Sequence, residues 1–146
     1  MSRRRRRSKL LCIEQLETRQ MLSAGVATGW GLPVVQVSDD CGDAFEAAAQ
    51  VTLSSTGSAR LTGQIEQAFD VDMFQIVAPV TGQLMIQQLA LRGNRLDPSL
   101  RVYDSQQQLI AENDDSGWSR KSAAVISVTA GQTYYVQAAG YGWTRG

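Results

Sequence analysis

The sequence contains no histidine and only two cysteines, Cys12 and Cys41. Without imidazole, this chain cannot build a Ser-His-Asp site, a Cys-His site or a zinc site with histidine ligands. Two cysteines are too few for the disulfide framework that holds many small secreted domains together. The sequence also lacks any run of 18 apolar residues, so we expect no membrane-spanning segment.

Proline and charge are also sparse: the chain has three prolines, and 19% of its 146 residues are charged. The apolar fraction of 43% is typical of a globular protein and not of a disordered or fibrous one. A chain of this length has room for one domain with one hydrophobic core.

The net charge of zero conceals a division of the chain into a basic start and an acidic remainder. Residues 1–20 carry seven basic and two acidic side chains, a net charge of +5, whereas residues 21–146 carry seven basic and twelve acidic ones, a net charge of −5. An acidic domain repels phosphate backbones, so we expect no nucleic-acid partner for it. A basic arm that binds nucleic acid remains an alternative for the start.

The first 24 residues have features of an export signal. The basic run RRRRRSK is followed by a short apolar stretch, which charged residues interrupt, and then by the small residues Ser23-Ala24-Gly25. An amphipathic helix over residues 9–22 is the structural alternative, with Leu10, Ile13, Leu16 and Gln20 on one stripe.

The stretch LETRQMLSA at residues 16–24, behind the polyarginine run, resembles the LEPR-x-LL segment at the N-terminus of planctomycete exported and surface proteins. Thr18 stands in place of the usual proline and Met21 in place of leucine. The resemblance implies that residues 1–24 are an export or sorting segment and that the protein is secreted or held at the cell surface. We therefore expect residues 1–24 to be dispensable for folding, with residues 25–38 as linker and leader.

Beyond the linker, apolar residues alternate with polar ones in short runs that turn residues separate, which predicts strands. The predicted strands are Val34–Val37, Gln50–Leu53, Ala59–Ile65, Met73–Ala78, Gln83–Leu89, Ser99–Tyr103, Gln108–Ala111, Ala123–Val128 and Thr133–Ala138. The residues expected to face inward are Leu61, Ile65, Phe74, Ile76, Leu84, Ile86, Leu100, Val102, Ala124, Ile126, Val128, Tyr134 and Val136. Their spacing favours an all-β fold, an antiparallel β-sandwich like a jelly roll, with one short helical turn within Asp43–Ala49.

Four motifs within residues 39–146 occur in an order typical of one bacterial module: DVDMF, LDPSLRVYD, NDD and AGQTYYVQAAGYG. This part of the chain resembles the pre-peptidase C-terminal domain, a jelly-roll module of secreted proteases and planctomycete surface proteins. The family has one more strand after the Gly140-Tyr141-Gly142 turn, and this chain stops at Gly146. The resemblance thus implies a sandwich truncated by about one strand, with an unpaired neighbour that promotes self-association.

The same resemblance implies a calcium site, because collagen-binding modules of similar fold hold Ca²⁺ between an acidic leader and the D-x-D-x-F strand. The corresponding ligands are five aspartates: Asp39, Asp40, Asp43, Asp70 and Asp72. Calcium takes six to eight oxygen ligands, which clustered carboxylates can supply. Alternatively, such aspartates accept hydrogen bonds from backbone N–H groups in turns, as we expect for Asp97, Asp104 and Asp114.

Three aromatic residues near predicted turns are candidate ligand contacts: Trp118, Tyr141 and Trp143. Aromatic side chains on the loops of a sandwich can stack on sugars or peptides. The alternative is that they cover one end of the core.

No pattern of nucleophile, acid or base is recognisable, so we expect a protein that is not an enzyme. The expected function is a non-catalytic binding or scaffolding module outside the cell, whose partner is an extracellular polymer, matrix or an attached catalytic domain. The alternative is an accessory or maturation domain of a secreted peptidase whose catalytic domain lies outside this chain.

Overall fold

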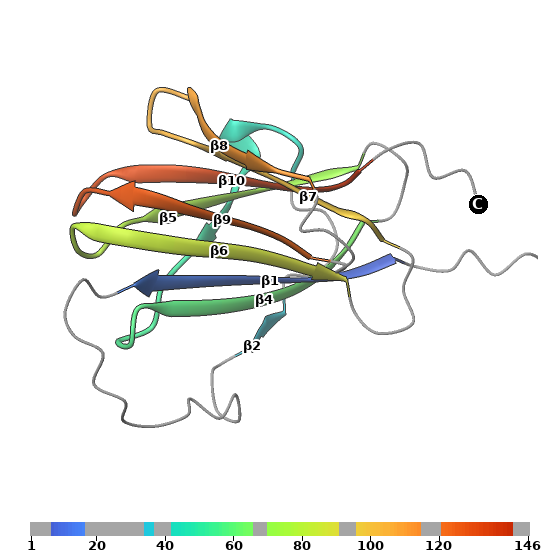
Figure 1. Cartoon of the computed structure of the whole chain (residues 1–146), viewed down its shortest axis with the longest axis horizontal. Helices are drawn as coiled ribbons and strands as arrows, with labels where there is room; N and C mark the ends of the chain where they lie inside the picture. Colours follow the sequence, from blue (N-terminus) through green and yellow to red (C-terminus); the bar gives the residue numbers. More distant parts are fainter. Residues whose placement is uncertain are drawn as a thin grey trace, which may run out of the picture.

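The computed structural model describes residues 7–16, 34–36, 42–65, 70–90, 96–114 and 121–141. These residues form ten strands and one 3₁₀ helix (Figure 1). In chain order the elements are β1 (Arg7–Leu16), β2 (Val34–Gln36), η1 (Phe45–Ala47), β3 (Ala49–Val51), β4 (Ser58–Ile65), β5 (Val71–Val77), β6 (Gly82–Ala90), β7 (Pro98–Tyr103), β8 (Leu109–Asn113), β9 (Lys121–Val128) and β10 (Thr133–Gly140). The nine strands predicted after residue 33 are confirmed to within two residues at each end.

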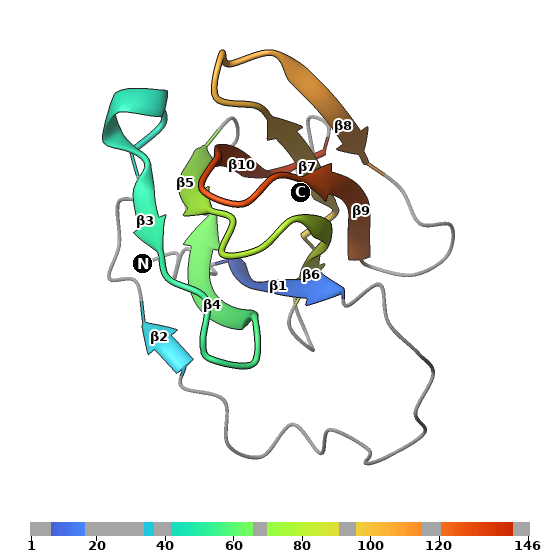
Figure 2. The same ribbon diagram turned by 90° about the vertical axis from the view of Figure 1, so that its left-hand side faces the viewer.

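The strands form two five-stranded sheets that pack face to face, so the predicted all-β sandwich is confirmed (Figure 2). Sheet A has the order β2-β4-β1-β6-β9, and sheet B has the order β3-β5-β10-β7-β8. Their neighbours pair antiparallel, except that the short edge strands β2 and β3 pair parallel to β4 and β5. The sandwich is therefore mixed at two of its edges.

The two ends of the sandwich differ. At the turn end, short turns join β3 to β4, β5 to β6, β7 to β8 and β9 to β10. At the loop end, β4, β6, β8 and β10 finish and β1, β5, β7 and β9 begin (Figure 1). Gly131 has a φ of +79° in the β9–β10 turn, a conformation that favours glycine.

Residues that alternate along the strands fill the space between the sheets. The predicted inward residues are all buried, among them Phe74 of sheet B and Ile86 of sheet A, which are at most 2% exposed. The 3₁₀ helix η1 confirms the short helical turn predicted within Asp43–Ala49. Period-two alternation therefore predicted these thirteen core residues correctly, while five further buried apolar residues beyond residue 33 were not named: Val51, Met73, Ala78, Leu96 and Ala138.

Strand β1 contradicts the expectation that residues 1–24 take no part in the fold. It lies in the middle of sheet A, where Arg7–Glu14 pairs with β4 and Lys9–Leu16 pairs with β6 (Figure 1). Leu11 and Ile13 are 0% and 1% exposed. Residues 9–16 form a strand where a helix over residues 9–22 was the alternative, and the rest of that range lies outside the described residues. Pairing on both sides satisfies the backbone of this strand, and alternation buries the two side chains.

Strand β1 has a partner on both sides in sheet A, while the expectation of a sandwich truncated by about one strand stays a prediction, because residues 142–146 lie outside the described part of the chain. Strands β4 and β6 both end at the loop end, and β1 runs between them in the opposite direction. Within the described part of sheet A, both therefore have a partner along most of their length.

Two uncharged polar side chains lie in the core near the loop end. Gln88 of β6 and Ser122 of β9 are opposite each other in the register and both are 0% exposed. The Gln88 Nε2 donates a hydrogen bond across the sandwich to the Ala139 carbonyl of β10, at 3.0 Å. Among the described residues, the Gln88 Oε1 and the Ser122 Oγ find no hydrogen-bond partner.

Because the Ser122 hydroxyl has no hydrogen-bond partner among the described residues, we expect its removal to stabilise the protein. A buried polar group without a partner costs about 1–3 kcal/mol, so Ser122→Ala should raise the free energy of unfolding by about 1 kcal/mol. The matched change Ala124→Ser, two residues along the same strand, should lower it, because Ala124 is also buried. Urea unfolding of both variants tests this, and a loss of stability in Ser122→Ala would mean that the hydroxyl has a partner.

The central position of β1 predicts that the N-terminal segment contributes to stability. Ile13→Ala should lower the free energy of unfolding by about 2–5 kcal/mol, the usual cost of such a cavity. Val125→Ala is the control, because Val125 lies in β9 of the same sheet and its side chain is 52% exposed. Equal denaturation midpoints for the two variants would show that residues 7–16 do not contribute to the stability of the sandwich.

Candidate functional site

Three of the predicted site residues share the loop end of the described structure: Asp70, Asp72 and Tyr141. Asp70 and Asp72 lie at the start of β5, and Tyr141 directly follows β10. Because β5 starts where β10 finishes, these residues of distant segments share one end of sheet B. Asp39, Asp40, Trp118 and Trp143 lie outside the described residues.

The leader before β3 is held against the outer face of sheet B. The Met73 N–H of β5 donates to the Gly42 carbonyl at 3.3 Å. The Phe45 ring of η1 packs edge-on against the rings of Tyr103 and Tyr135, with centroid distances of 5.1 and 5.2 Å. The Gly42 contact places the leader, and with it Asp43, near Met73 at the start of β5, while the Phe45 ring holds the leader on the sheet.

The described carboxylates alone do not form a calcium site. Asp43 is exposed, Asp70 is half-buried and Asp72 is only 5% exposed. No group of three or more acidic, cysteine or histidine side chains with a metal-binding arrangement occurs in the described part of the chain. Since calcium needs six to eight oxygens, the predicted site depends on Asp39 and Asp40 for completion.

One aspartate has the alternative role of capping a turn. The Asp104 Oδ1 accepts hydrogen bonds from the backbone N–H groups of Gln106 and Gln108, each at 2.9 Å. Asp104 lies in the β7–β8 turn, where Gln107 has a φ of +62°. The turn-capping prediction for Asp104 is thus confirmed, and this residue lies at the turn end, away from the acidic group.

Tyr141 is an exposed aromatic residue on a fixed piece of backbone. Its side chain is 53% exposed, and its N–H donates to the Asp97 carbonyl at 2.6 Å. Gly140 lies so close to Leu96 that an added Cβ would be 3.0 Å from the leucine Cδ1. The segment before β7 therefore supports the end of β10 and holds the tyrosine in place.

Sequence reasoning selected Tyr141 but missed the two residues that support it. Leu96 is 1% exposed, and the backbone carbonyl of Asp97 accepts the hydrogen bond from the tyrosine N–H. The signal available was the LDP motif itself, whose leucine could be recognised as apolar but not assigned to a partner in another strand.

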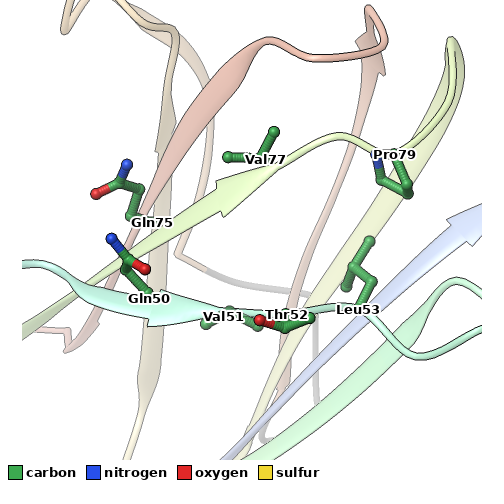
Figure 3. Close-up of a pocket in the computed structure, with 7 residues that line it drawn as sticks. All are labelled: Gln50, Val51, Thr52, Leu53, Gln75, Val77 and Pro79. Atoms are coloured by element: carbon green, nitrogen blue, oxygen red, sulfur yellow. The ribbon is translucent and has the colours of Figure 1, made fainter.

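A shallow groove lies along the edge of sheet B, between β3 and β5 (Figure 3). Its volume is about 220 Å³, which is less than the 300–1,000 Å³ typical of small-molecule sites. It is lined by uncharged residues: Gln50, Val51, Thr52, Leu53, Gln75, Val77 and Pro79. Neither the volume of the groove nor its uncharged lining supports a catalytic site there.

A comparison of the chain with protein-family models finds no match, and a search of curated proteins finds none either. The two family resemblances thus depend on the motifs alone and remain predictions. None of the described segments forms a helix of the length and apolar character needed to cross a bilayer.

The predicted calcium site has a direct test in thermal stability. A ligand that binds only the folded state, at one hundred times its dissociation constant, stabilises by about 2.7 kcal/mol. We therefore expect the melting temperature to rise on adding Ca²⁺ to chelator-treated protein, and Asp70→Asn and Asp72→Asn to reduce the rise.

The control for this experiment is Asp104→Asn, which removes a carboxylate of the turn end and should leave the calcium-dependent rise unchanged. Identical melting temperatures of the unaltered protein with Ca²⁺ and with chelator would show that the loop end does not bind calcium.

Proposed function

We propose that this protein is a non-catalytic binding or scaffolding module that works outside the cell, secreted or attached to the surface. The observation that supports the proposal is the exposed Tyr141, held on the end of a rigid sandwich at the same end as Asp43, Asp70 and Asp72. Binding residues are commonly placed on the connections of such a scaffold. The basic start with its LETRQMLSA stretch supports the extracellular location.

The partner that suits this end has flat apolar faces and hydroxyl or amide groups. A tyrosine stacks on a sugar ring or packs on a peptide, while neighbouring carboxylates accept hydrogen bonds from hydroxyl and amide donors. Polysaccharides of the cell wall and fibrous proteins of a matrix both offer this combination. An attached catalytic domain is the other partner class, and its contact would use the same exposed end.

The binding proposal is tested by co-sedimentation of the full chain with insoluble polymers, namely peptidoglycan, cellulose, chitin and fibrillar collagen. We expect retention on at least one of them and an affinity at least about tenfold weaker in Tyr141→Ala, which corresponds to about 1.4 kcal/mol for a contributing aromatic contact.

Leu109→Ala is the matched control, because Leu109 is 49% exposed and begins β8 near the turn end. It should bind as the unaltered chain does. Failure to bind any of the four polymers, or equal weakening by both substitutions, would contradict a polymer-binding role for the loop end.

A further inference from the structure

We infer that the position between β4 and β6 is a binding site for an extended strand, and that a second copy of this chain can fill it with its own residues 7–16. The product is a dimer in which the two copies exchange β1. This inference concerns the interior of sheet A and is independent of ligand binding at the loop end.

The first argument is topological. Strand β1 precedes the other described strands and is joined to them through residues 17–33, so it can leave the sheet without separating β4 from β2 or β6 from β9. The strands on its two sides remain in the chain through their own connections, β4 to β5 and β6 to β7. Exchange of an identical element between two copies is a low-cost route to a dimer.

The second argument is the length of the connection to β2. By strand spacing and register, the end of β1 and the start of β2 are about 16 Å apart, because β4 lies between them. Residues 17–33 provide 17 residues, which reach as far as about 60 Å when extended. The connection therefore allows β1 to enter its own sheet or that of a neighbouring molecule.

The third argument is that the position between β4 and β6 accepts only a strand with the direction and apolar pattern of β1. An incoming strand must run antiparallel to both β4 and β6 and place apolar side chains where Leu11 and Ile13 are buried. A second copy supplies the same sequence in the same register. Charge also favours it, since residues 1–20 carry +5 and the remainder of each copy carries −5.

The register provides a chemical test, because it places Cys12 of β1 opposite Gln87 of β6. Directly opposite positions in antiparallel strands are close enough for a disulfide. An acceptor chain carries Gln87→Cys with Cys12→Ser and Cys41→Ser, and a donor chain carries only Cys41→Ser. A disulfide between donor and acceptor then forms efficiently only when β1 of the donor lies in the acceptor sheet.

The two full-length chains are unfolded together in denaturant, refolded at about 1 mM each and oxidised with glutathione disulfide. A connection of this length gives an effective concentration in the millimolar range, so exchanged and closed forms should be comparable in amount. We expect a covalent heterodimer on non-reducing gels, on the order of one third of the chains, falling to a few percent when refolding takes place at about 10 μM.

The control acceptor carries Gln83→Cys in place of Gln87→Cys. Gln83 pairs with Leu16, so its position is four residues, or about 13 Å, from the one opposite Cys12, which is too far for a disulfide. Heterodimer yields equal to this control would overturn the inference. If the donor chain refolds poorly, a synthetic peptide of residues 7–16 replaces it, added in molar excess while the acceptor refolds. The peptide must form the same disulfide, and its failure to do so counts equally against the proposed site.

Discussion

The rest of the structure depends on one constraint: the backbone N–H and C=O groups that β4 and β6 direct toward each other need hydrogen-bond partners. These strands lie too far apart to pair with each other, and each leaves a row of N–H and C=O groups directed toward the gap between them. Strand β1 satisfies both rows at once and adds Leu11 and Ile13 to the core. Sheet A is continuous from β2 to β9 only because this N-terminal strand occupies its centre.

Most of the fold could be predicted because its information is local. Period-two alternation indicated the strands from Val34 onward, and the Asp104 and Gly131 turns indicated where they reverse. Strand β1 could not be predicted in this way. Leu10, Ile13 and Leu16 fit a helical period, whereas Leu11 and Ile13 fit a strand period. Partners in β4 and β6 decide between them, and those partners are distant in the sequence.

The candidate site was predictable in composition but not in arrangement. The sequence shows Tyr141 between two glycines, and it shows the closely spaced Asp70 and Asp72. The hydrogen bond from Tyr141 to Asp97 is not, because it joins two strand ends that only the sheet order brings together. The same holds for Gln88 and Ser122, which alternation places inward with no indication of how their polar atoms are satisfied.

If residues 1–24 act in export, as proposed, residues 7–16 must meet two requirements at different stages. An export segment must be an extended, accessible chain when it is recognised, whereas a central strand is paired on both sides and covered. The two states exclude each other for residues 7–16, since pairing with β4 and β6 withdraws their backbone from any other partner. A role in export would therefore require recognition before sheet A closes. Completion of the sheet would then remove the signal and stabilise the sandwich in the same step.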